Sequence, residues 1–131
     1  MLPKERIVMN EKTIKITCHV NLTSKPDKLD ELLDALEICA ASSRKEPGCE
    51  YYEVIQSIAQ PNEITLIAKF SNYDAFNAHF NNEDIREFID NKQSALLISM
   101  SNKVYITRID SIGNRGQDDT SNLSFRGDII S

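Results

Sequence analysis

The chain has 131 residues, of which 40% are hydrophobic and 27% are charged, values that are typical of one soluble globular domain. The net charge is -5 at pH 7 and the Lys and Arg residues are scattered, so the sequence lacks the basic face with which nucleic-acid-binding proteins neutralise phosphates. No apolar run approaches the length of a membrane span, and the polar start of the chain is unlike a secretory signal, so we expect a cytoplasmic protein.

The first predicted elements are a strand and a helix. Residues 13–22 alternate apolar and polar side chains with a period of two, which predicts a half-buried strand. A helix is predicted from Pro26, because proline is favoured in the first helical turn, to about Ser43. Its leucines recur at helical spacing, which indicates one apolar stripe facing a sheet.

Two further strands follow the dipeptide Pro47-Gly48, which ends the helix. Residues 49–57 are rich in aromatic and β-branched side chains, and residues 64–70 carry alternate apolar side chains on one face. Pro61-Asn62 between them is typical of a turn, so we expect the two strands to pair as a hairpin.

Two helices and a last strand complete the predicted order. Ser71 or Asn72 can cap a short helix, and Asn82 can cap a longer one that carries apolar residues as far as Leu97. Residues 103–109 alternate again and are predicted to form the fourth strand. The order βαββαβ predicts a ferredoxin-like α+β fold, in which two helices cover one face of a four-stranded antiparallel sheet.

This order occupies residues 13–109. Residues 1–12 and 110–131 are therefore interpreted as an N-terminal extension and a C-terminal tail. The second face of the sheet is expected to carry more apolar surface than a monomer usually exposes, so we expect a homodimer formed sheet to sheet. The apolar side chains predicted for that face are Tyr51, Ile55, Ile67 and Tyr105.

His79, among aromatic residues on the short predicted helix, is the candidate proton acceptor. An imidazole with an ordinary pKa of about 6.5 can take a proton from a phenolic or enolic substrate at neutral pH if it faces a cavity. The alternative is a hydrogen-bonded histidine of the core. His19 lies in the polar register of the first strand, where a surface or interface position is the simpler interpretation.

The sequence predicts no metal site. The two histidines form no HxxH or HExxH pattern, and the three cysteines form no CxxC pattern. Free cysteines in apolar surroundings behave as small hydrophobic side chains, which favours structural thiols in a reducing compartment. These cysteines are Cys18, Cys39 and Cys49.

Three short motifs resemble the antibiotic biosynthesis monooxygenase family, which includes small quinol monooxygenases. They are Glu46-Pro47-Gly48-Cys49 followed by Tyr52, the run Phe70-Ser71-Asn72-Tyr73-Asp74-Ala75-Phe76, and Ala78-His79. The resemblance covers residues 13–109 and implies a dimeric α+β barrel of ferredoxin-like subunits, each with a pocket between its helices and its sheet. Several relatives oxygenate quinols or anthrones with O2 and neither metal nor flavin, so no cofactor is expected.

The resemblance implies oxidation of a small quinol or phenolic substrate by O2. His79 would be the general base, and Tyr52 or Asn21 would donate a hydrogen bond to the substrate anion. Deprotonation gives an electron-rich anion that can pass an electron to oxygen before the radical pair recombines. The walls that exclude water are assigned to Phe70, Phe76 and Phe80.

The chain departs from the family pattern at three positions. Ala68 and Phe70 stand where a glutamate and a tryptophan are common, and Asp84 stands where a second histidine often follows the first. Two other functions therefore stay open, because fold alone selects none. One is a noncatalytic ligand-binding or regulatory dimer of the same fold, and the other is a haem-handling protein that uses His79.

Overall fold

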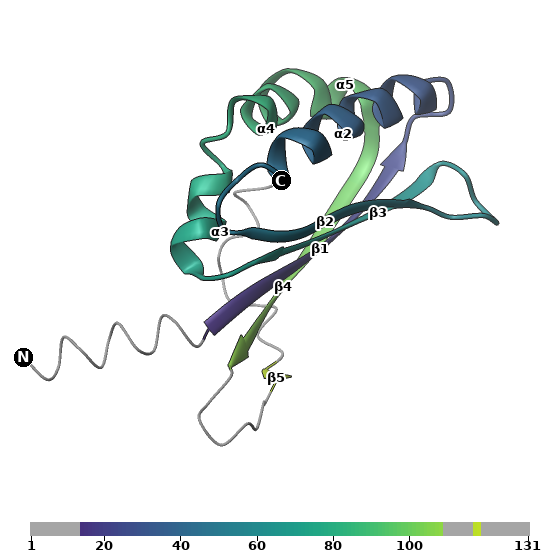
Figure 1. Cartoon of the computed structure of the whole chain (residues 1–131). Helices are drawn as coiled ribbons and strands as arrows, with labels where there is room; N and C mark the ends of the chain where they lie inside the picture. The colour runs from purple at the N-terminus through teal and green to yellow at the C-terminus, as the bar shows by residue number, and fades with distance from the viewer. Residues whose placement is uncertain (1–13, 109–116, 119–131) are drawn as a thin grey trace, which may run out of the picture.

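The computed structural model describes residues 14–108 and 117–118 (Figure 1). The predicted extension, residues 1–12, and all of the predicted tail except residues 117–118 lie outside the described residues. The predicted ferredoxin-like α+β fold is confirmed, with helices on one face of an antiparallel sheet. Its strands and helices are β1 (Ile14–Ser24), α2 (Leu29–Ser43), β2 (Cys49–Gln56), β3 (Glu63–Phe70), α3 (Tyr73–His79), α4 (Glu83–Glu87), the π-helical turn η1 (Phe88–Lys92), α5 (Gln93–Leu96), β4 (Leu97–Arg108) and β5 (Gln117–Asp118).

The strands are ordered β2-β3-β1-β4-β5 in the sheet, and every neighbouring pair is antiparallel. β2 and β3 form the predicted hairpin. β5 was not predicted as a strand, and it pairs with residues 106–107 at the end of β4. No helix in the described part of the chain is long and apolar enough to cross a membrane.

The last long strand begins earlier than predicted. β4 starts at Leu97 rather than at Lys103, and the preceding helix ends at Leu96. Residues 98–102 are mostly serine, asparagine and methionine, which have weak strand propensity, so the pattern alone did not indicate a strand. Pairing with β1, which places Met100 opposite Leu22, fixes this segment as a strand.

The first helix begins later than predicted. Pro26 lies in a turn, which the Lys28 N–H closes by donating to the Lys25 carbonyl at 3.0 Å, and α2 starts at Leu29. The two predicted asparagine caps are correct. The Asn72 side chain accepts a hydrogen bond from the Ala75 N–H at the start of α3, and Asn82 accepts one at the start of α4.

The core lies between the helices and the inner face of the sheet. Strand alternation directs the even-numbered side chains of β1 and β3 toward the helices and the odd-numbered ones away from them. The large apolar side chains that are at most 1% exposed are Ile16, Leu22, Leu32, Leu36, Ile64, Phe70 and Phe76.

The outer face of the sheet has the composition expected from the sequence. Tyr51 and Ile55 are 42% and 45% exposed, and Ile67 lies on the same face, because its β-strand neighbours Leu66 and Ala68 point into the core. Lys69 places its ammonium group over the Tyr51 ring, 5.3 Å from the ring centroid. The rings of His19 and Tyr105 also meet on this face, 5.5 Å apart between centroids.

Gly48 allows helix α3 to pack closely against the turn before β2. A Cβ atom at Gly48 would overlap the Cβ of Ala75 and would lie 3.2 Å from Ser71 Oγ. The Gly48 carbonyl accepts a hydrogen bond from the Ser71 N–H at 2.9 Å, so the turn and the start of the α3 segment are also joined through the backbone. The glycine is therefore required by space rather than by backbone conformation.

We expect Gly48→Ala to lower the free energy of unfolding by about 1–3 kcal/mol, because the added methyl group overpacks the contact with Ala75. Urea unfolding monitored by circular dichroism measures the change. The matched control is the double variant Gly48→Ala/Ala75→Gly, in which the two methyl groups no longer meet. If the effects of the two single substitutions simply add, the close contact does not limit stability.

Candidate functional site

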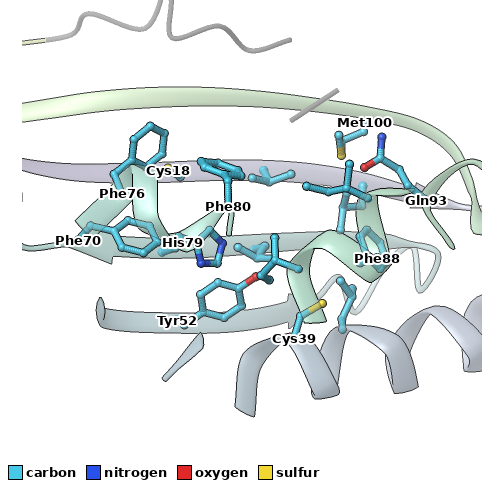
Figure 2. Close-up of a pocket in the computed structure, with 17 residues that line it drawn as sticks. Cys18, Cys39, Tyr52, Phe70, Phe76, His79, Phe80, Phe88, Gln93 and Met100 are labelled. Atoms are coloured by element: carbon cyan, nitrogen blue, oxygen red, sulfur yellow. The ribbon is translucent and has the colours of Figure 1, made fainter. Parts of the chain in front are cut away.

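A cavity of about 70 Å³ lies between the inner face of the sheet and the helices (Figure 2). Its walls are almost entirely apolar, and side chains from β1, β2, β3, β4 and all the helical segments contribute to them. Five of the six residues predicted for the site line it together. They are Tyr52, Phe70, Phe76, His79 and Phe80.

Asn21, the sixth predicted residue, does not line this cavity. Its neighbours Val20 and Leu22 point into the core, so strand alternation places Asn21 on the outer face of the sheet. There the Thr65 hydroxyl donates a hydrogen bond to Asn21 Oδ1 at 3.0 Å. The structure therefore does not bring Asn21 into one pocket with His79, because the two residues lie on opposite sides of the sheet.

His79 is the last residue of α3 and faces the interior. The residue is 7% exposed, and its ring lies 5.0 Å from the Phe70 ring, 5.2 Å from Phe80 and 5.7 Å from Tyr52 between centroids. Figure 2 shows the imidazole surrounded by these three aromatic rings at one end of the cavity. The surroundings are those of a sheltered base rather than of a surface histidine.

The partner of His79 is Glu46, from the turn before β2. The imidazole Nδ1 lies 3.1 Å from Glu46 Oε1 and 3.0 Å from Glu46 Oε2. Asn82 donates a hydrogen bond from Nδ2 to the same carboxylate at 2.7 Å. Asn82 in turn accepts a hydrogen bond from the Ser42 hydroxyl at 3.0 Å, so α2, the turn and the start of α4 together hold the carboxylate in place.

This contact determines which nitrogen of His79 can act as a base. An ionised carboxylate only accepts hydrogen bonds, so Nδ1 must carry the proton when it binds ionised Glu46. The lone pair of the neutral ring is then on Nε2. Within residues 14–108 and 117–118, Nε2 makes no hydrogen bond. In hydrolases that use a Ser-His-Asp triad, the histidine base is oriented in the same way: a carboxylate accepts the hydrogen bond of Nδ1–H, and Nε2 is left to accept a proton.

The sequence did not reveal the roles of Glu46 and Asn82. The sequence indicates only that Glu46 belongs to a turn motif and that Asn82 caps a helix. Glu46 is 33 residues from His79 in the chain, and no periodicity connects residues in a turn and on a helix at that separation. The pairing becomes visible only when α3 packs against the turn at Gly48.

The other titratable groups around the cavity stay neutral at pH 7. Burial raises the pKa of Tyr52 far above its ordinary value, so its hydroxyl keeps its proton and can donate a hydrogen bond. Burial also raises the pKa of Cys18 to about 12 and that of Cys39 to about 11, so both thiols are poor nucleophiles. No cluster of His, Cys, Asp or Glu in the described residues has the composition of a metal site.

A second, open cleft lies on the other side of Glu46. It has a volume of about 660 Å³ and is lined by polar residues that include Glu46, Asn72, Asp74 and Asn82. The Glu46 side chain is 16% exposed, compared with 9% for that of His79. The carboxylate therefore stands between the apolar cavity and solvent.

Comparison with solved structures finds the same fold in several bacteria. A Shewanella oneidensis protein is 27% identical, with a TM-score of 0.68, and the match covers 72% of this chain and 91% of that one. A Pseudomonas aeruginosa protein is 24% identical (TM-score 0.67, covering 71% of this chain and 93% of that one). A candidate antibiotic biosynthesis monooxygenase of Nitrosomonas europaea is 19% identical (TM-score 0.65, covering 72% and 89%). Comparison with curated proteins gave no match.

The sequence profile of one family matches residues 15–91, which include β1, β2, β3, the turn with Glu46 and the helix with His79. That family is described as antibiotic biosynthesis monooxygenase. The matched segment is more than half of the chain, and it contains the motifs on which the resemblance was based. The chain belongs to the antibiotic biosynthesis monooxygenase family.

Proposed function

We propose that the protein is a cofactor-independent monooxygenase that oxidises a small quinol or phenolic substrate with O2, and that His79 is its general base. The observation that carries the proposal is the Glu46–His79 pair, which leaves Nε2 free beside an apolar cavity. Membership of the family supports it, and so does a relative described as a candidate monooxygenase.

The proposed reaction begins with proton transfer from a substrate hydroxyl to Nε2 of His79. The Glu46 carboxylate stabilises the resulting imidazolium. The substrate anion passes one electron to O2, and recombination of the two radicals forms a carbon–oxygen bond. Loss of water then leaves an oxidised ring that retains one oxygen atom of O2.

The walls of the cavity suit this chemistry. Phe70, Phe76 and Phe80 surround the reacting end with apolar rings, which keeps water from reprotonating the anion. The neutral Tyr52 hydroxyl is retained as the proposed donor to the anion, because its raised pKa keeps it protonated. Asn21 has no role in the proposed mechanism, because it lies on the other side of the sheet.

The size of the cavity limits what it can bind. A volume of 70 Å³ is smaller than the cavity of about 150 Å³ that accepts a benzene ring in an engineered protein. Side chains must therefore move to admit one aromatic ring, and Phe80, Ile89 and Met100 are only partly buried. A haem is several times larger than one aromatic ring. Of the three functions considered, haem handling is therefore the one that the size of this cavity supports least. A noncatalytic binder of the same ligand would use the same cavity.

We expect His79→Gln to reduce the rate of oxygen uptake with hydroquinone or methylhydroquinone by about 100-fold or more, because the general base is lost. An oxygen electrode measures the rate. The matched control is His19→Gln, which changes a histidine on the outer face and should leave the rate unchanged. An unaffected rate in His79→Gln removes His79 from the mechanism. Binding of the quinol by the wild-type protein without oxygen uptake would favour the noncatalytic alternative.

Glu46→Gln should lower the same rate by about 10-fold or more, because an amide can donate to Nδ1 and so favour the tautomer whose Nε2 carries the proton. The ¹⁵N chemical shifts of His79 report the tautomer directly. Glu50→Gln is the control, since Glu50 pairs with Lys15 away from the cavity. If the rate falls while the tautomer stays the same, Glu46 acts through its charge on the imidazolium rather than through the tautomer.

We also propose that two copies associate through the outer faces of their sheets. Tyr51, Ile55, Ile67 and Tyr105 place apolar side chains on a face that no helix of the described chain covers. The family resemblance implies the same dimer. Each copy would keep its own cavity, because the cavity lies on the opposite side of the sheet.

We expect Ile55→Asp to convert a dimer into a monomer in sedimentation equilibrium, since it would bury a charge in the proposed interface. The matched control is Ile58→Asp, because Ile58 is 98% exposed in the β2–β3 loop, and this variant should remain dimeric. A monomeric wild-type protein would contradict the proposal.

A further inference from the structure

A polar group at the far end of the cavity has no role in the function proposed above. Gln93, the first residue of α5, lines the cavity, and its Oε1 atom is buried and makes no hydrogen bond to any described residue. Figure 2 shows Gln93 beside Met100, at the end of the cavity opposite His79, with the rings of Tyr52, Phe70, Phe76 and Phe80 at the His79 end. The apolar cavity therefore has polar groups at both ends, those of His79 and Tyr52 at one end and that of Gln93 at the other.

An unbonded amide oxygen in this position destabilises the folded protein. A buried acceptor without a partner loses its hydrogen bonds to water and gains none in return. The neighbouring inward positions of the helical segment are apolar, with Ile89 before Gln93 and Leu96 after it. An apolar side chain of similar length would therefore continue this apolar stripe at position 93. A ligand that formed a hydrogen bond with the Gln93 amide would remove this loss of stability.

The backbone around Gln93 is also unusual. The Gln93 N–H donates to the carbonyl of Phe88, five residues earlier, which is the hydrogen bond of a π-helical turn. Such turns are rare in proteins overall, but those that do occur are frequently found at functional sites. Here the turn joins α4 to α5, and Phe88, Ile89 and Gln93 all line the cavity.

We infer that Gln93 is a substrate-recognition residue, and that the cavity selects a single aromatic ring with hydroxyl groups at two opposite ends. One hydroxyl would transfer its proton to His79, and the other would bond to the Gln93 amide. This inference rests on the proposed function, because it names the substrate class for the same cavity. A hydroxyl both donates and accepts, so it matches either atom of the amide.

The neighbouring Met100 gives this end of the cavity room to adapt. Methionine has a flexible, unbranched side chain that fills irregular spaces and repacks easily. Met100 lies beside Gln93 in Figure 2 and is only partly buried. Movement of the Met100 side chain would lengthen the 70 Å³ cavity at the Gln93 end.

The test compares two ligands in the absence of oxygen, so that no oxidation occurs. Hydroquinone has hydroxyl groups at both ends of its ring, and 4-methylphenol has a methyl group in place of one of them. Isothermal titration calorimetry should show that changing Gln93→Met weakens hydroquinone binding by about 10-fold or more relative to 4-methylphenol binding. Ser94→Ala, at the exposed neighbouring position, should leave the ratio of the two affinities unchanged.

Two results of the binding measurements would overturn the inference. One is an equal loss of affinity for both ligands in Gln93→Met, which would indicate a general structural effect. The other is a failure of the wild-type protein to bind hydroquinone. The melting temperature of ligand-free Gln93→Met should rise, since the unbonded oxygen is removed, and a large fall would also contradict the inference.

Oxygen uptake separates this inference from the proposed function. Selective binding of hydroquinone through Gln93 without any turnover in air would refute the monooxygenase and leave the recognition role intact. Turnover with no dependence of hydroquinone selectivity on Gln93 would refute the recognition role alone.

Discussion

The hydrogen bond between Glu46 and His79 is the interaction on which the site depends. It joins the turn before β2 to the end of α3 and places the imidazole between a carboxylate and an apolar cavity. The carboxylate also lines an open cleft of mixed polar and apolar residues and is 16% exposed, so it avoids the full cost of burial. The imidazole, by contrast, lines the apolar cavity. This one contact therefore lies between a solvent-accessible cleft and an apolar cavity, an arrangement that the proposed sheltered base requires.

The position of His79 depends on tertiary contacts rather than on the helix that carries it. α3 has only seven residues, too few to form a stable helix by itself. The Asn72 cap fixes its start, and the close approach of Ala75 to Gly48 fixes its distance from the turn. Because Gly48 follows Glu46 by two residues, the contact that positions the helix also positions the carboxylate. Fold stability and site geometry are coupled at this turn.

The sequence predicted the elements that have clear periodicity, and it failed where contacts are distant. Alternation located β1 and β3, and the family resemblance suggested four of the residues that line the cavity with His79. The strand that contains Asn21 was correctly predicted. Its alternation places Asn21 on the outer face of the sheet, so the pattern itself argues against a position beside His79. Glu46 and Asn82 were missed as partners of His79, since their contact spans two elements. Gln93 left a signal that could have been used, a polar residue within an apolar helical stripe.

The two ends of the cavity are explained by the same physical argument. Burying a polar atom without a hydrogen bond costs stability, and apolar side chains would fill these positions at lower cost. His79 and the buried, unbonded Oε1 of Gln93 nevertheless line a space whose other walls are almost entirely apolar. A core that served only stability would have no need of either group, whereas a ligand with complementary groups at both ends would satisfy them together. We therefore interpret the unbonded Gln93 amide as preorganisation for the proposed ligand rather than as imperfect packing.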